Sequence, residues 1–78
     1  THFDEVHADF FNRLKEKYPQ LSPKDLRLCA YIRMNMSTKE ISAITHQTVK
    51  TINMARFRLR KKLNIDRDEN LLSYFKSL

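Results

Sequence analysis

Residues 37–63, which read STKEISAITHQTVKTINMARFRLRKKL, decide the fold. Ser37 is followed three residues later by a glutamate, which is the spacing of a capping box at the start of a helix. Thr48 is a second residue suited to cap a helix, and the helical spacing of apolar residues continues after it to the end of the stretch. The stretch therefore predicts a short helix over 37–45, a tight turn, and a longer helix over 48–62.

These two helices are expected to turn their isoleucines inward, Ile41 and Ile44 on the first helix and Ile52 on the second. The opposite face of the second helix then mixes cations with an amide and two large apolar side chains: Lys50, Asn53, Met54, Phe57, Arg58 and Lys61. Residues 50–65 hold six basic side chains and no acidic one, which equals the formal net charge of +6 for the whole chain. A merely solvated face would alternate Glu with Lys, so this acid-free face indicates a polyanionic partner.

Two further helices are expected before this pair. Residues 3–18 predict an amphipathic helix that ends before Pro19, because the residue preceding a proline is pushed out of the helical region. Its apolar stripe is expected to comprise Phe3, Val6, His7, Phe10, Phe11, Leu14 and Tyr18. Ser22 is placed to cap a second helix that runs to about Met34, since a proline at the first helical position favours a helix start.

The ends of the helices are marked by residues that tolerate unusual backbone geometry. The chain contains no glycine, so Asn35 and Asn64 are expected to take the left-handed conformation that commonly ends a helix. Asp66 or Asp68 is expected to cap a last helix, whose apolar residues are Leu71, Leu72, Phe75 and Leu78. Every segment therefore reads as helix, and the predicted fold class is all-α.

Composition excludes several functions. A chain of 78 residues allows one small domain, and a chain without glycine cannot form the glycine-rich loops that cradle phosphates. No apolar run approaches the roughly 18 residues of a membrane span, and no signal-peptide pattern opens the chain. A single cysteine, Cys29, suits a reducing cytoplasm and reads as a small core residue. Because the three histidines show no metal-ligand spacing and no catalytic set is present, we expect no enzyme activity, no metal and no cofactor.

Two motifs carry a resemblance to a known family. LSPKD at residues 21–25 and STKEIS at residues 37–42 are similar to the L-T-P-R-E and L-S-N-K-E-I-A motifs of LuxR-type (GerE-type) helix-turn-helix domains, at the same separation. Thr48, Thr51 and Ile52 then occupy the S-x-x-T-V positions of that family. The chain thus resembles the C-terminal output domain of a bacterial transcriptional regulator.

The resemblance implies a four-helix helix-turn-helix domain over residues 20–78. Residues 1–19 would add one N-terminal amphipathic helix at the end of a linker, and the Thr at position 1 suggests a piece of a longer protein. The implied function is sequence-specific binding of double-stranded DNA, with helix 48–62 in the major groove. The implied location is the cytoplasm, with no membrane contact by this domain.

Site residues follow from the resemblance and agree with the outward face of helix 48–62. Three of them are expected to face base edges, namely Asn53, Met54 and Phe57. Another set is expected to contact DNA phosphates, namely Thr38, Lys39, Thr48, Lys50, Arg58 and Lys61. For Arg56, an ion pair with Glu40 and a phosphate contact stay as alternatives, whereas Arg60 and Lys62 are expected to be solvated flanks.

A homodimer on DNA is expected, because one half-site gives weak affinity. Its candidate surface is the last helix, with Leu71, Leu72, Phe75 and Leu78, although these residues could instead close the core. Two alternatives to the regulator remain. A domain like region 4 of sigma factors would also contact RNA polymerase, and a protein-interaction module would use helix 3–18 together with the outward Met54 and Phe57.

Overall fold

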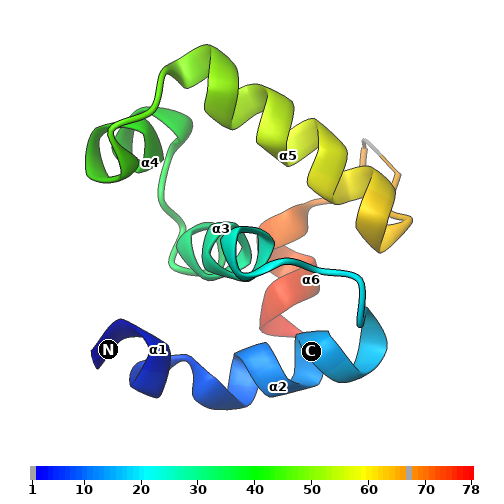
Figure 1. Ribbon diagram of the computed structural model, residues 1–78. Coiled ribbons are helices and arrows are strands. Elements are labelled where there is room, and N and C mark those ends of the chain that lie inside the picture. Colours follow the sequence, from blue (N-terminus) through cyan, green and yellow to red (C-terminus); the bar gives the residue numbers. More distant parts are fainter. Residues whose placement is uncertain (1, 67) are drawn as a thin grey trace.

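The computed structural model describes residues 2–66 and 68–78, and all regular elements within them are helices. In chain order these are α1 (His2–Val6), α2 (Ala8–Lys17), α3 (Pro23–Arg33), α4 (Thr38–Thr45), α5 (Val49–Leu63) and α6 (Leu71–Lys76). In Figure 1, α3 and α6 lie between α2 on one side and the pair α4 and α5 on the other. The all-α prediction is confirmed.

One hydrophobic core draws side chains from every helix between α2 and α6. Leu14 of α2, Leu59 of α5 and Phe75 of α6 are fully buried, although they are far apart in the sequence. Cys29 of α3 lies in the same core. Since a chain of this size buries a smaller share of its surface than a larger protein does, each of these contacts matters for stability.

Three helices begin at the residues that the sequence indicates. The side chain of Ser22 accepts a hydrogen bond from the Asp25 amide at 3.2 Å and starts α3. Ser37 starts α4 with a complete capping box, in which the Glu40 carboxylate accepts from the Ser37 amide at 2.8 Å. The Thr48 hydroxyl group caps α5. Each cap satisfies an amide that the helix itself leaves without a partner.

The turns that follow α3, α4 and α5 each use a left-handed residue. Asn35 has φ 62° and Asn64 has φ 55°, as expected for the asparagines. His46, with φ 58°, ends α4 in the same way, which the sequence did not indicate. The Ser42 hydroxyl donates to the Gln47 carbonyl across this turn and so holds α4 close to the start of α5.

The helix expected over 3–18 is divided at His7, which has φ −102° and ψ 10°. The two parts stay connected, because the His7 amide donates to Phe3 at 3.2 Å and the His7 carbonyl accepts from Phe11 at 2.9 Å. Phe3 of α1 still packs near Phe11 of α2, with 6.3 Å between the ring centres. Val6, however, was expected on the buried stripe and is 62% exposed.

Two expectations about the short helices were wrong. Ile44 is 56% exposed, because the buried face of α4 passes through Ile41 and the partly buried Thr45 instead. The last helix begins one turn later than expected, and Asn70 caps it by accepting from the Ser73 amide at 3.2 Å. Neither Asp66 nor Asp68 is that cap.

Candidate nucleic-acid interface

The core holds α5 by one face only. Ile52, Leu59 and Leu63 are at most 2% exposed and fix the orientation of the helix about its axis. At its start, the Thr48 hydroxyl accepts from the Thr51 amide at 3.1 Å and donates to the Thr51 hydroxyl at 2.9 Å. The hydroxyl of Thr48, a predicted phosphate ligand, is therefore occupied as a helix cap.

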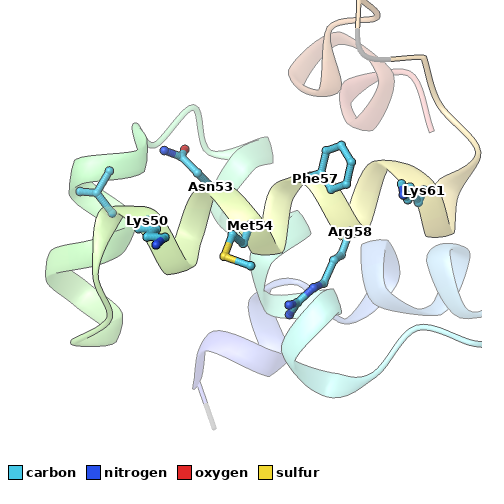
Figure 2. A pocket seen from close by; sticks show the side chains of 7 residues that line it. Lys50, Asn53, Met54, Phe57, Arg58 and Lys61 are labelled. Atoms are coloured by element: carbon cyan, nitrogen blue, oxygen red, sulfur yellow. The ribbon is translucent and has the colours of Figure 1, made fainter.

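The side chains on the opposite face line a shallow groove along α5 (Figure 2). We call this surface the α5 groove, and it comprises Val49, Lys50, Asn53, Met54, Phe57, Arg58 and Lys61. Six of these residues are the ones predicted to face outward, and all are exposed. Val49, which is 40% exposed, was missed because valine in a helix reads as a core residue. Among the described residues that line it, none is acidic.

The polar end of the α5 groove is tied to α4. The Thr38 hydroxyl donates to Oδ1 of Asn53 at 3.4 Å, so the Asn53 side chain lies beside the first residue of α4. Lys39 is exposed next to Thr38. The N-terminus of α4, with amide groups that favour an anion, is thus brought next to the predicted base-reading asparagine.

At the other end of the groove, Lys61 folds over Phe57. The Lys61 Nζ atom lies 4.6 Å from the centre of the Phe57 ring, within the range of a cation–π contact. The ring is still 60% exposed. A positive charge and a large apolar surface are therefore presented together.

The six basic residues of 50–65 fall into two sets. Lys50, Arg58 and Lys61 form no ion pair among the residues described, and they line the α5 groove. The remaining three are Arg56, Arg60 and Lys62. Arg60 and Lys62 bond to other parts of the fold, and Arg56 is half-buried. The sequence placed the positive charge on α5 but did not divide it in this way.

Arg60 and Lys62 were expected to be solvated flanks, but each of them bonds to another part of the fold. Arg60 donates from Nη1 to the carbonyls of Asp66 at 2.9 Å and Glu69 at 2.8 Å, which holds the chain between α5 and α6. Lys62 pairs with Asp25 of α3 at 2.6 Å. Burial by itself raises the pKa of Asp25, but the hydrogen bonds from Lys62 and Ser22 lower it overall.

Arg56 is half-buried on the side of α5 that faces the fold. Its burial, and then the nearby charge of Arg60, lower the pKa of the guanidinium group. No ion pair joins it to Glu40 within the described ranges, since the Glu40 carboxylate accepts from the Ser37 amide instead. Arg56 also lies outside the α5 groove.

The candidate dimer residues are divided between the core and the surface. Leu71 and Phe75 are 2% and 0% exposed, so they close the core of the single chain. Phe10 of α2 meets the Phe75 ring edge-on at a centroid distance of 5.6 Å. Leu72 and Leu78 stay partly exposed and are the two that a second chain could reach.

The one cysteine of the chain is buried in the core. Burial, followed by the charge of Asp25, raises the pKa of the Cys29 thiol to about 12, so this thiol stays protonated. Residues 2–66 and 68–78 hold no group of three His, Cys, Asp or Glu able to bind a metal. Among the helices described, none has the length and apolar character needed to cross a bilayer.

Comparison with models of known protein families, with curated proteins and with solved structures found no match to this chain.

Proposed function

We propose that this chain binds double-stranded DNA through α5, as the DNA-binding output domain of a bacterial transcriptional regulator of the LuxR type. One observation carries the proposal: the three groove cations share an exposed, acid-free face with Asn53, Met54 and Phe57. An α-helix with its side chains is about 10–12 Å across, which suits a major groove about 12 Å wide. The resemblance of residues 20–78 to LuxR-type domains supports the same function.

In this mechanism α5 enters the major groove and α4 lies above it. Lys50, Arg58 and Lys61 contact phosphates on the two sides of the groove, which fixes the position of the helix without reading sequence. Lys39 and the first amides of α4 contact a phosphate nearby. Asn53, held against Thr38, is then close enough to donate to or accept from a base edge.

A second copy on a paired half-site would raise the affinity, because each copy alone makes few contacts. On α6, Leu72 and Leu78 remain partly exposed and are the candidates for contact between copies. The resemblance therefore leads us to propose a homodimer on DNA.

The experiment is a salt titration of binding to random-sequence duplex DNA. Lys50→Ala and Lys61→Ala should each weaken binding to every duplex and reduce the slope of log affinity against log salt by about one unit. Lys15→Ala on α2 is the matched control, since it removes the same charge from an exposed site across the molecule from α5 (Figure 1). Equal slopes for all three variants, or no binding at low salt, would refute the proposal.

The exposed apolar side chains also suit a protein partner, which is the second candidate function. Met54 is 46% and Phe57 60% exposed, and exposed apolar groups of this kind often mark a protein contact. This candidate predicts that duplex DNA does not bind at any salt concentration. If the chain instead resembles region 4 of sigma factors, it binds purified core RNA polymerase as well as DNA.

A further inference from the structure

Met54 and Phe57 form an apolar patch in the middle of a basic surface. They lie three residues apart on α5, and both line the α5 groove between Lys50 on one side and Arg58 and Lys61 on the other, with Phe57 above the helix axis and Met54 below it in Figure 2. Neither side chain belongs to the core cluster. The fold therefore does not require them to be apolar, and their exposure to water is unfavourable until something covers them.

The charge around the patch limits what can cover it. An apolar protein surface would leave three cations without counter-charges, and burying unpaired charges is costly. A DNA major groove offers phosphates to the cations and, at its floor, one apolar group that is large enough to matter, the C5-methyl of thymine. The other base edges in that groove present hydrogen-bonding groups.

The spacing of the patch also fits. Three residues of helix advance by about 4.5 Å, while successive bases along a strand are about 3.4 Å apart. The two side chains can therefore reach neighbouring base pairs. The Lys61 Nζ atom lies 4.6 Å from the centre of the Phe57 ring, on its face, which leaves the apolar edge of the ring for a base.

We infer that Met54 and Phe57 act as a methyl-reading patch that selects thymines at neighbouring base pairs. The inference rests on the proposed DNA-binding function and specifies what the centre of that site reads. It assigns sequence preference to apolar contacts, beside the hydrogen bonds of Asn53. Uracil, which has the same hydrogen-bonding groups as thymine and lacks only the methyl, is the natural probe.

The test begins by selecting preferred duplexes from a random pool made with ordinary thymine. The selected duplex is then synthesised again with uracil in place of every thymine, and both forms are titrated with the chain. Each lost methyl contact should weaken binding about fourfold, so two contacts predict about a fifteenfold loss. The Met54→Ala/Phe57→Ala double variant should bind both duplexes equally.

Met34→Ala is the control variant, because Met34 has a similar exposure, 45%, but lies outside the α5 groove. It should keep the preference of about fifteenfold for the thymine duplex. Tight and equal binding of both duplexes by the unchanged chain, or selection of sites without thymine, would overturn the methyl reading and leave DNA binding intact. A preference that survives in the double variant would overturn its assignment to these two residues. Absence of any duplex binding would refute both proposals.

Discussion

At the scale of single residues, His7 combines a polar ring with an apolar environment. It is 7% exposed, and its ring lies 4.7 Å from that of Phe3 and 5.9 Å from that of Phe11. Within residues 2–66 and 68–78, its Nδ1 atom has no hydrogen-bond partner. Burial, and then the positive charge of Arg33 on α3, lower the pKa of the imidazole below its ordinary value of 6.5. The surroundings of His7 in the folded protein therefore favour the neutral form of the ring over the charged one.

This environment makes stability depend on pH. Because the pKa of His7 is lower in the folded chain than in the unfolded one, the unfolded chain takes up the proton first as the pH falls below 6.5. The free energy of unfolding should therefore decrease between about pH 7.5 and about pH 5. His7→Phe keeps an aromatic ring and should remove most of this decrease, as measured by urea unfolding at both pH values.

His46→Asn is the control for that measurement. His46 is exposed and left-handed, and asparagine tolerates the same backbone conformation, so this variant removes a histidine without disturbing the core. It should keep the full pH dependence. If His7→Phe retains it as well, the titrating group is not His7.

The sequence placed His7 on a buried stripe but did not predict the break in the helix there. The stripe follows from helical spacing, which is a local property. The break belongs with a contact to another helix, since the Phe3 ring packs 5.4 Å from that of Tyr31 on α3. Residues that are this far apart in the sequence do not reveal such a contact.

At the scale of helices, the first residues of three helices could be predicted from the sequence, but the contacts with other helices could not. Ser22, Ser37 and Thr48 cap through hydrogen bonds that reach only three residues along the chain, so the local sequence contains the whole interaction. Before α6, Arg60 of α5 donates to the carbonyls of Asp66 and Glu69, and the helix is capped only at Asn70.

For the basic residues of α5, the sequence likewise predicted the positions but not the bonding partners. Helical periodicity located the outward residues, because their positions depend only on where the buried stripe lies. It could not separate the cations that bind the fold from those that remain available. That separation depends on Asp25 of α3 and on the carbonyls after α5, which are partners from other elements.

The left-handed turn after α5 gives a test at this scale. Asn64 has φ 55°, and the Ile65 amide donates to the Arg60 carbonyl at 3.0 Å, so the helix ends in a defined geometry. Asn64→Ala should lower the free energy of unfolding by about 1–2 kcal/mol, because a side chain with Cβ and no polar group is disfavoured there. Asn64→Gly should be neutral or stabilising in the same urea measurement.

Asn12→Ala on α2 provides the contrast, since Asn12 is exposed within a helix, where alanine is favoured. It should leave stability unchanged or raise it slightly. Equal losses for alanine at both positions would mean that backbone conformation at Asn64 is not what the side chain supports.

At the scale of the whole molecule, α2 is part of the same core as the proposed DNA-binding unit. Phe10 contacts Phe75, and the hydroxyls of Tyr18 and Tyr74 are hydrogen-bonded to each other. Burial and then this hydrogen bond raise the pKa of Tyr18 to about 12. Arg13 also donates to the carbonyl of Leu78 at 2.9 Å. The boundary expected between residues 19 and 20 therefore separates two segments that pack against each other in the structure.

The sequence showed that α2 has an apolar stripe, but a stripe does not specify what it packs against. The apolar residues of α6 were expected either to form a dimer surface or to close the core. Leu71 and Phe75 close the core. The contact of Phe75 with Phe10 joins α6 to α2. Such pairings depend on the arrangement of all six described helices and are not visible in any local pattern.

Shared packing predicts that the two ends of the chain unfold together. Phe10→Ala should lower the free energy of unfolding by about 3–5 kcal/mol, a large part of the 5–15 kcal/mol typical of a small domain. Val6→Ala, at a position that is 62% exposed, should change it little. Because Phe10 is not among the residues that line the α5 groove, the folded fraction of Phe10→Ala should still bind duplex DNA with unchanged salt dependence. A chain starting at residue 20 should lose cooperative urea unfolding, since Phe75 would then face water. If that shorter chain unfolds at the same urea concentration as the full one, α1 and α2 contribute no stability and the expected boundary at residue 20 is the correct one.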